Sequence, residues 1–202
     1  MDGSTDNKAT KGERTRAAIL DHATAIASRL GLEGLTIGSL ADATGMSKSG
    51  LFAHFGSREE LQLAVLEDAA QRFADVVAQP SFKIPRGLPR LRAIVEHWCE
   101  WAQRYERGCV LLSAVGEYDG RDGALHDAVV RQQAGWRSQL EKAIGQAVDE
   151  AHLGRATDVT QLAFEIYAFM LVLHHDAGLF GYEEARRRAL AAVDRLFASY
   201  RT

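Results

Sequence analysis

Residues 35–55 constrain the fold of this chain most strongly, because they have the spacing of a helix-turn-helix. Ala41 is small at the point where a second helix must cross closely. Gly45 follows four residues later and suits a turn residue with positive φ, a conformation that costs a residue with a side chain free energy. A small core between the two helices is expected from three apolar side chains: Leu40, Met46 and Leu51.

Two hydroxyl residues stand where the helices of this motif should begin. Thr36 is at the N-cap position of the first helix and Ser47 at that of the second. A helix-turn-helix places its second helix in the major groove of DNA, with the first turn at the base edges. The motif therefore predicts that the chain binds double-stranded operator DNA through the helix that Ser47 opens.

Charge and composition fit a DNA-binding end attached to a larger globular body. The chain has 202 residues, 47% of them hydrophobic and 25% charged, which is enough to bury a core and more than a DNA-binding module alone needs. Its net charge of −3 excludes a generally basic coat, but residues 8–58 hold seven basic and four acidic side chains. The positive charge is thus concentrated around the motif, although a solvated surface could show the same bias.

The remaining composition indicates a soluble, cytoplasmic protein. Cys99 and Cys109 are isolated thiols without metal-ligand spacing, which suits a reducing compartment. Residues 1–11 are polar and lack the apolar region of a signal peptide, and no uninterrupted apolar run reaches the roughly 20 residues of a spanning helix. We expect no cofactor, no metal and no membrane partner.

Helical periodicity accounts for the first half of the chain. We expect a polar, disordered tail whose basic residues either follow DNA or are simply solvated, and then a helix over 14–30 that Gly31 stops. A capping box of Ser57 and Glu60 opens a long helix to about Val77. Three prolines then mark the best candidate boundary: Pro80, Pro85 and Pro89, the last in the first turn of a helix that Gly108 ends.

The second half contains further helices and no alternating strand pattern, so the fold class is all-α. A short helix over 109–115, a loop over 116–123 and a long helix over 125–148 are predicted. Residues 158–174 are apolar on nearly every face, and after a break at Gly178 and Gly181 an amphipathic helix covers 182–200. This hairpin would form a four-helix dimer interface, with these candidate residues: Phe164, Leu171, His175, Val193 and Leu196.

Residues 12–77 resemble the DNA-binding domain of the TetR family of bacterial transcriptional regulators. The resemblance rests on these matching positions: Ala18-Ile19-Leu20, Gly34-Leu35-Thr36-Ile37, Leu40-Ala41, Gly45, Ser47 to Phe52, His54-Phe55 and Ser57 to Leu61. It implies a homodimer in which each subunit has a three-helix DNA-binding domain over 12–72, with its motif at about 36–55. A helical ligand-binding and dimerisation domain would follow over 73–202, after a tail over 1–11.

The DNA-binding candidates lie in and around the second motif helix: Thr36, Ser47, Lys48, Ser49, Gly50, Phe52, His54 and Arg58. Lys48 could donate to a guanine or only to a phosphate, and Gly50 would allow close backbone approach. Many relatives carry tyrosine where this chain has Phe52, so a phosphate contact is replaced by contact with a thymine methyl or by packing. Four of these residues are phosphate candidates: Thr36, Ser47, His54 and Arg58. The alternatives are capping alone for Thr36 and Ser47 and a structural role for His54.

The resemblance also implies a small-molecule pocket in the helical body, for a small apolar or aromatic ligand. Six residues are candidates for its lining: Trp98, Trp101, Tyr105, Trp136, Tyr167 and Met170. Aromatic residues at helical spacing are more often ordinary core, which is the alternative for each of them. Polar groups that orient the ligand could come from four side chains: His97, Gln132, His174 and His175.

Three functions are compared on these observations. The first is a repressor that a ligand releases from a palindromic operator, and the second is a DNA-binding regulator without a ligand, whose body contacts proteins. The third is a metal-dependent enzyme using His174, His175 and Asp176, with Cys99 or His97 as a further ligand. Adjacent helical residues project about 100° apart, so the two histidines do not easily face one ion. The chain also lacks a nucleophile–base motif or phosphate loop. We therefore expect no enzymatic activity.

Overall fold

The computed structural model describes residues 10–105 and 108–201, and within these ranges the chain is helical and forms no strand. The predicted all-α fold class is confirmed. The elements are α1 (Lys11–Gly34), α2 (Ile37–Thr44), α3 (Lys48–Phe55), α4 (Arg58–Phe73), the π-helix η1 (Ala74–Ala78), α5 (Gln79–Phe82), α6 (Leu88–Arg104), α7 (Val110–Tyr118), α8 (Ala124–Asp149), α9 (Val159–Phe180) and α10 (Tyr182–Ser199).

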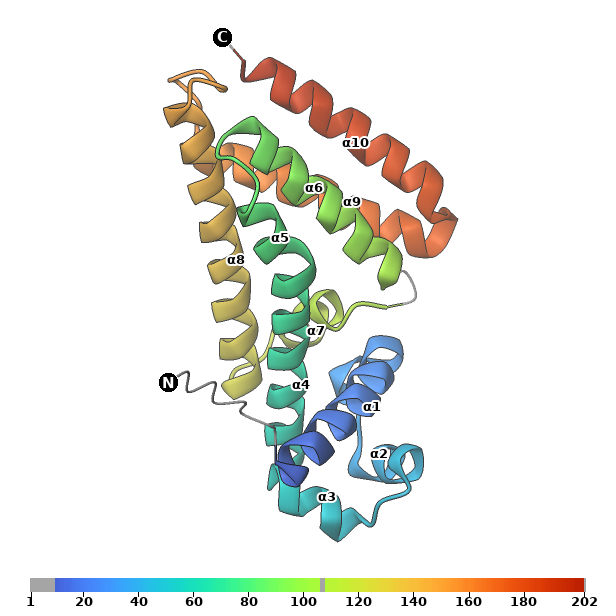
Figure 1. Cartoon of the computed structure of the whole chain (residues 1–202). Coiled ribbons are helices and arrows are strands. Elements are labelled where there is room, and N and C mark those ends of the chain that lie inside the picture. Colours follow the sequence, from blue (N-terminus) through green and yellow to red (C-terminus); the bar gives the residue numbers. More distant parts are fainter. Residues whose placement is uncertain (1–9, 106–107, 202) are drawn as a thin grey trace, which may run out of the picture.

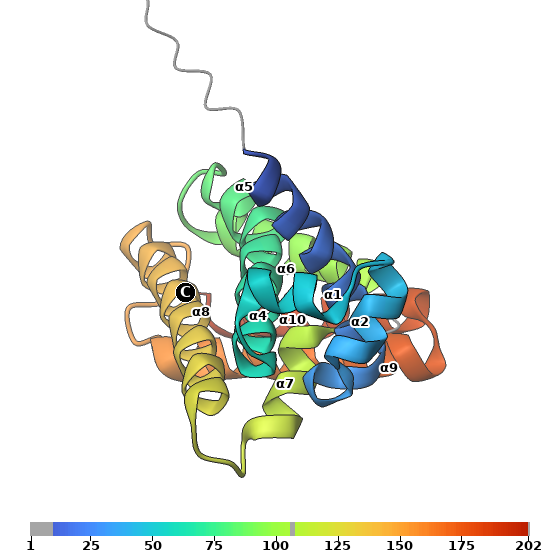
Figure 2. The same ribbon diagram turned by 90° about the horizontal axis from the view of Figure 1, so that it is seen from below.

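The helices form a small head and a larger body (Figure 1). The head consists of α1, α2, α3 and the start of α4. The body holds the other helices, with α6, α9 and α10 at the end far from the head. In the view from below, α2 and α3 are nearest to the viewer and the body lies behind them (Figure 2). Five buried side chains form the centre of the head: Ile19, Leu40, Leu51, Phe55 and Leu61.

Helix α1 starts earlier and ends later than predicted. Thr10 is its N-cap and forms a capping box with Glu13, so Thr10 and Lys11 belong to the helix and not to the predicted tail. The rest of that tail, residues 1–9, lies outside the described residues. Gly31 interrupts the regular helix with the non-helical angles φ 75° and ψ 170°, so the break predicted there is confirmed, and a short further helical turn follows to Gly34.

The predicted end of the next helix at Val77 is also wrong. Helix α4 continues through η1 into α5 and ends at Phe82, past Pro80. The proline lies in the first turn of α5, after the wider π turn. Ser81 helps to hold this turn, because its hydroxyl donates to the carbonyl of Val77 at 2.6 Å. The helix that joins the head to the body is therefore longer than the sequence indicates and contains a local irregularity.

Two glycines that were assigned to breaks lie inside helices. Gly116 is within α7, which extends to Tyr118, and Gly178 is within α9, which extends to Phe180 and ends at Gly181. Glycine is only about 1 kcal/mol worse than alanine in a helix interior, so packing can override it. Helix α6 ends at Arg104, ahead of the predicted Gly108, and α10 ends at Ser199, close to its predicted end.

The capping box predicted for α4 is half formed. The Oγ of Ser57 accepts from the N–H of Glu60 at 3.0 Å, as expected. The N–H of Ser57 donates instead to the carbonyl of Phe55, which closes the tight turn between α3 and α4. The carboxylate of Glu60 lies beside Gly56, which has a φ of 69°.

Helix α9 is long and largely apolar, and it packs against α6, α8 and α10. By length and composition this helix could cross a membrane, as could the core helix of a water-soluble protein. It contributes seven buried residues to the body core: Leu162, Ala163, Ile166, Tyr167, Met170, Leu173 and Ala177.

Candidate functional site

The first turn of α3 is held out at the surface of the head. Gly45 turns the chain with φ 67° and ψ 14°, the left-handed conformation predicted for it. Ser47 caps α3 by accepting from the N–H of Gly50 at 3.1 Å. Lys48 and Ser49 are exposed, whereas Leu51 and Phe55 on the other face are buried. The apolar face of α3 thus packs into the head, and its first turn is accessible to a partner.

The two N-caps are confirmed, but their hydroxyl protons are not both free. The Oγ1 of Thr36 accepts from the N–H of Ser39 at 3.0 Å, and the Oγ of Ser39 accepts from the N–H of Thr36 at 3.2 Å. The hydroxyl of Thr36 also donates to Ser39 Oγ at 3.0 Å. Ser47 Oγ lies 3.1 Å from Ser49 Oγ, so one of these hydroxyls donates to the other. A phosphate contact by Thr36 would need its hydroxyl to turn away from Ser39.

Phe52 and His54 occupy different environments on α3. The ring of Phe52 is 45% exposed, so it does not act as a core residue and is available for apolar contact outside the subunit. His54 is half-buried in the last turn and lies next to Phe55. Gly50 has little room for a larger residue, because a Cβ there would lie 3.2 Å from Ser47 Oγ.

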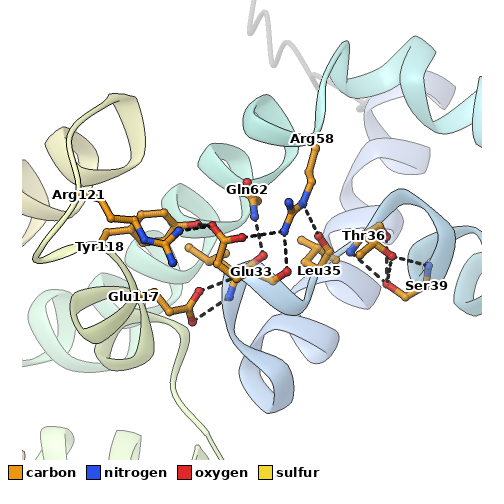
Figure 3. Close-up of polar contacts among 10 residues, drawn as sticks. Glu33, Leu35, Thr36, Ser39, Arg58, Gln62, Glu117, Tyr118 and Arg121 are labelled. Carbon is orange, nitrogen blue, oxygen red and sulfur yellow. Dashed lines mark hydrogen bonds and ion pairs between the residues drawn. The ribbon is translucent and has the colours of Figure 1, made fainter.

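The structure gives the guanidinium of Arg58, a predicted phosphate ligand, three oxygen partners inside the head. Its guanidinium donates to the carbonyl oxygens of Leu35 at 3.0 Å and Glu33 at 2.5 Å. It also forms an ion pair with the carboxylate of Glu33 at 3.1 Å (Figure 3). These bonds join the start of α4 to the end of α1, so Arg58 is a structural residue of the head.

Glu33 lies at a polar junction between the head and the body (Figure 3). Its carboxylate accepts from the hydroxyl of Tyr118 and from Arg121, both at 2.9 Å. The hydrogen bond from Tyr118 lowers the pKa of Glu33, and Arg58 and Arg121 act in the same direction. Glu117 accepts from the backbone N–H groups of Leu32 and Glu33 at 3.1 and 2.8 Å. Helix α7 is therefore tied to the last turn of α1.

A cavity of about 220 Å³ lies in the body, between α4, η1, α6, α7, α8 and α9. Four of the predicted residues line it: Trp98, Trp101, Trp136 and Tyr167. Two do not. Tyr105 follows the end of α6 and stacks on Trp101 with ring centroids 4.1 Å apart, and Met170 is 1% exposed and fills the body core.

The aromatic lining is one connected cluster around Phe73, which the sequence analysis missed. Its ring meets Trp98, Trp101 and Trp136 edge to face, with centroids 5.6, 5.3 and 4.8 Å away. Phe73 comes from the end of α4, and Ala74 and Ala78 of η1 also line the cavity. The apolar stripe of this helix continues past residue 72, the predicted domain boundary. That continuation was the sequence feature that could have placed Phe73 in the body. The helix that supports the head is thus part of the cavity wall.

Two of the predicted polar groups reach the cavity and two do not. Gln132 and His174 line it, and burial lowers the pKa of His174 to about 4, so this imidazole is neutral at pH 7. His97 instead pairs with Ser81 at 2.8 Å. His175 is exposed and pairs with Asp176 at 2.9 Å. Adjacent His174 and His175 therefore do not share a site, and no group of three or more metal-ligating residues occurs in the described part of the chain.

The predicted dimer residues divide by exposure. Phe164 is 58% and Leu171 37% exposed, and His175 is also exposed. Leu196 is partly buried against the core. Val193 is 3% exposed and packs within its own subunit, so its side chain is not available to a partner and the expectation for it is wrong. Val172, which is 58% exposed beside Leu171, was not predicted.

Comparison with known families matches both parts of the chain. Residues 19–65 match the model described as bacterial regulatory proteins, tetR family. Residues 87–193 match the model described as Tetracyclin repressor-like, C-terminal domain, and this second match alone covers more than half of the chain.

Curated relatives match over a shorter segment. The transcriptional repressor AcnR of Corynebacterium glutamicum is 37% identical over 79 residues, which are 39% of this chain and 42% of that protein. The AcnR repressor of Corynebacterium efficiens is 35% identical over the same length. The chain thus matches less than half the length of these relatives.

Solved structures match over nearly the whole chain. A TetR-family regulator from Streptomyces coelicolor has a TM-score of 0.82 at 20% identity, over 96% of this chain and 98% of that one. AibR, solved with isovaleryl coenzyme A and operator DNA, has a TM-score of 0.72 at 25% identity, over 90% of this chain and 97% of that one. From its two family matches and this shared fold, the chain belongs to the TetR family of bacterial regulatory proteins.

Proposed function

We propose that this protein is a sequence-specific transcriptional repressor that binds a palindromic operator as a homodimer in the bacterial cytoplasm and is released by a small ligand. The observation that carries the DNA-binding part is the exposed first turn of α3, with Lys48 and Ser49 outward and Leu51 and Phe55 anchored below. This is the edge that a helix-turn-helix presents to base pairs. The AcnR relatives, which are repressors, support the direction of regulation.

The dimer is proposed to form through the outer face of α9. Phe164, Leu171 and Val172 project from that helix and are substantially exposed. Their spacing of seven and eight residues places them on one stripe. A second copy of the same helix would cover this stripe, and the two-fold symmetry of the dimer would match a palindromic operator.

Release by a ligand is proposed because the cavity wall and the support of the head are the same helix. Phe73, Ala74 and Ala78 line the cavity at the point where α4 changes into a π turn. A ligand that shifts this segment would move the start of α4, to which Arg58 ties the end of α1. Such coupling is typically worth 1–3 kcal/mol, about 5–150-fold in affinity. The AibR structure holds both an acyl coenzyme A and operator DNA. This supports the proposal that the present chain also binds DNA and a small ligand.

The cavity also favours this function over that of a regulator without a ligand, for which a filled body core would be expected. A purely structural core would not leave polar side-chain atoms facing an internal space. We propose no enzymatic role, because the chain belongs to a family of regulatory proteins and no cluster of metal-ligating residues occurs in its described part.

Selection of bound sequences from a random DNA pool tests this function. The purified protein should enrich one palindrome with half-sites about one helical turn apart, 10–10.5 base pairs from centre to centre. Enrichment of no sequence, or of single asymmetric sites only, would contradict the proposal. The selected DNA then serves to screen for molecules that weaken binding.

A further inference from the structure

The cavity contains polar atoms that the protein leaves without partners. Within residues 10–105 and 108–201, four buried side-chain atoms lack a hydrogen bond: both amide atoms of Gln132, Nε1 of Trp136 and Nε2 of His174. All three residues line the same cavity, from α8 and α9. Buried polar groups without a partner are rare and costly, about 1–3 kcal/mol each. Their concentration in one cavity points to a bound molecule that supplies the missing bonds.

The chemistry of these atoms defines what such a molecule must offer. The indole N–H of Trp136 is a donor only, so it needs an acceptor. The amide of Gln132 needs one acceptor and one donor, and Nε2 of His174 can serve in either sense according to its tautomer. A molecule with an acceptor, such as a carbonyl oxygen, and a donor, such as a hydroxyl, matches this set.

The remaining lining argues against a charged ligand. Aromatic rings from Phe73, Trp98 and Trp101 dominate the apolar wall, and such rings can hold a cation. However, among the residues that the structure describes, no aspartate or glutamate lines the cavity, and the one charged side chain of the lining is Arg131, which opposes a cation. Arg131 is exposed and stays hydrated, while His174 is neutral because burial lowers its pKa to about 4. A buried anion would therefore lack a desolvated cationic partner.

We propose that the cavity takes a compact, uncharged aromatic molecule that carries one hydrogen-bond acceptor and one donor, recognised by Gln132, Trp136 and His174. This inference rests on the proposed function only in taking the cavity as the ligand site. It names the class of the ligand, which the proposed function leaves open.

Four probes of similar size test the class. They are 4-hydroxyacetophenone, which is neutral and has both polar groups, 4-hydroxybenzoate, which is an anion, 4-hydroxyphenyltrimethylammonium, which is a cation, and 4-ethyltoluene, which has no polar group. Calorimetric titration of the full chain gives their affinities. All three tryptophans of the protein line the cavity, so a change in tryptophan emission reports whether a probe enters it. The neutral ketone should bind roughly tenfold more tightly than each of the other three, about 1.4 kcal/mol.

Two matched pairs of variants test the residues. Gln132→Leu and His174→Leu should each weaken binding of 4-hydroxyacetophenone roughly fivefold to tenfold and leave 4-ethyltoluene unaffected or better bound. The controls are Gln103→Leu, an exposed residue of α6 that does not line the cavity, and His175→Leu, the exposed neighbour of His174. Both should bind the ketone as the parent protein does.

The outcomes separate this inference from the proposed function. Tighter binding of the anion or the cation, equal binding of 4-ethyltoluene, or no binding of any probe would overturn the class named here, even if the protein still selects its operator. If the ketone binds with the stated preference but does not change operator affinity, the ligand class stands and release by a ligand of this class fails.

Discussion

The hydroxyl of Tyr118, at the end of α7, donates to the carboxylate of Glu33, in the last turn of α1, over 2.9 Å. The two residues are 85 positions apart in the chain and belong to the body and the head, respectively. Burial raises the pKa of Tyr118 and the hydrogen bond to Glu33 raises it further, while the same bond lowers the pKa of Glu33. The pair is therefore a hydrogen bond between a neutral phenol and a carboxylate that holds the head against the body.

Tyr118→Phe should reduce the free energy of unfolding by about 1 kcal/mol, because it removes the hydrogen bond from the buried Tyr118 to the carboxylate of Glu33. Denaturant unfolding at fixed protein concentration measures this. Tyr200→Phe is the control, since Tyr200 donates to Glu165 at 3.3 Å within the body, and it should change stability by less than about 0.5 kcal/mol. Equal effects of the two variants would show that the hydrogen bond to Glu33 contributes no more to the free energy of unfolding than the bond between Tyr200 and Glu165.

Gly31→Ala should destabilise the protein by at least about 2 kcal/mol. Gly31 has φ 75° and ψ 170°, a region that residues with side chains essentially never adopt. A Cβ there would lie 2.0 Å from Oε1 of Glu117, and displacement of that carboxylate would leave the N–H groups of Leu32 and Glu33 without their acceptor.

Gly145→Ala is the matched control for Gly31→Ala. Gly145 is in the interior of α8, and a Cβ there meets nothing within 4 Å. This variant should raise stability by about 0.5–1 kcal/mol. Thermal or denaturant unfolding of both variants decides the point, and a Gly31→Ala protein as stable as its parent would refute the account of the α1 bend.

The DNA-binding head was predictable from the sequence because its signals are local. Thr36, Gly45 and Ser47 act through their own backbone and the three residues that follow, so their caps and turn are visible in the sequence. The family resemblance depends on the same short range.

Long-range partners could not be read in this way. Arg58 turns toward Glu33 and Leu35 across 25 and 23 positions, which no spacing rule indicates. The error at Val193 has a similar cause, because an amphipathic stripe shows which side of α10 is buried but not whether its own subunit or a partner buries it. Pro80 was predicted to end the helix because nothing in the sequence indicates the π turn that accommodates the proline.

His174 should make the protein less stable at mildly acidic pH. Its pKa is about 4 in the folded protein, below the value of 6.5 of a free imidazole, so the unfolded chain binds the proton more readily. The contribution of neutral His174 to the free energy of unfolding is present above pH 6.5 and is lost as the pH falls through 4. Between pH 7 and pH 5 the free energy of unfolding should fall by about 2 kcal/mol for this reason. His174→Leu should remove this part of the pH dependence, and His175→Leu should retain it. Unfolding curves that fall equally with pH in both variants would contradict the assignment.

Phe164→Asp should weaken the proposed dimer. The substitution places a charge on the exposed stripe of α9, where a second copy would have to desolvate it. Sedimentation should show monomers at concentrations where the parent protein is dimeric. Val130→Asp, at an exposed apolar residue of α8, serves as control and should leave the dimer intact. The reverse pattern would place the interface on α8.

Lys48→Ala should distinguish base recognition from phosphate binding. If Lys48 reads a base, the variant should lose about 1–3 kcal/mol of preference at one base pair of each half-site. A uniform loss across all sequences, with a salt dependence lower by about one phosphate contact, would mean that it touches only the backbone. Competition binding at several salt concentrations measures both, with Lys142→Ala on the exposed surface of α8 as the control.

The central claim is that the first turn of α3 enters the DNA major groove, and a tethered cleavage reagent tests it most directly. Both native cysteines are buried, so an iron chelate can be attached selectively to Ser49→Cys in the exposed first turn of α3, with Ser199→Cys at the end of α10 as the control. On the selected operator, the Ser49→Cys conjugate should cut in two clusters about one helical turn apart, and the Ser199→Cys conjugate should not cut. A single unlocalised pattern, or equal cutting by both conjugates, would contradict the claim.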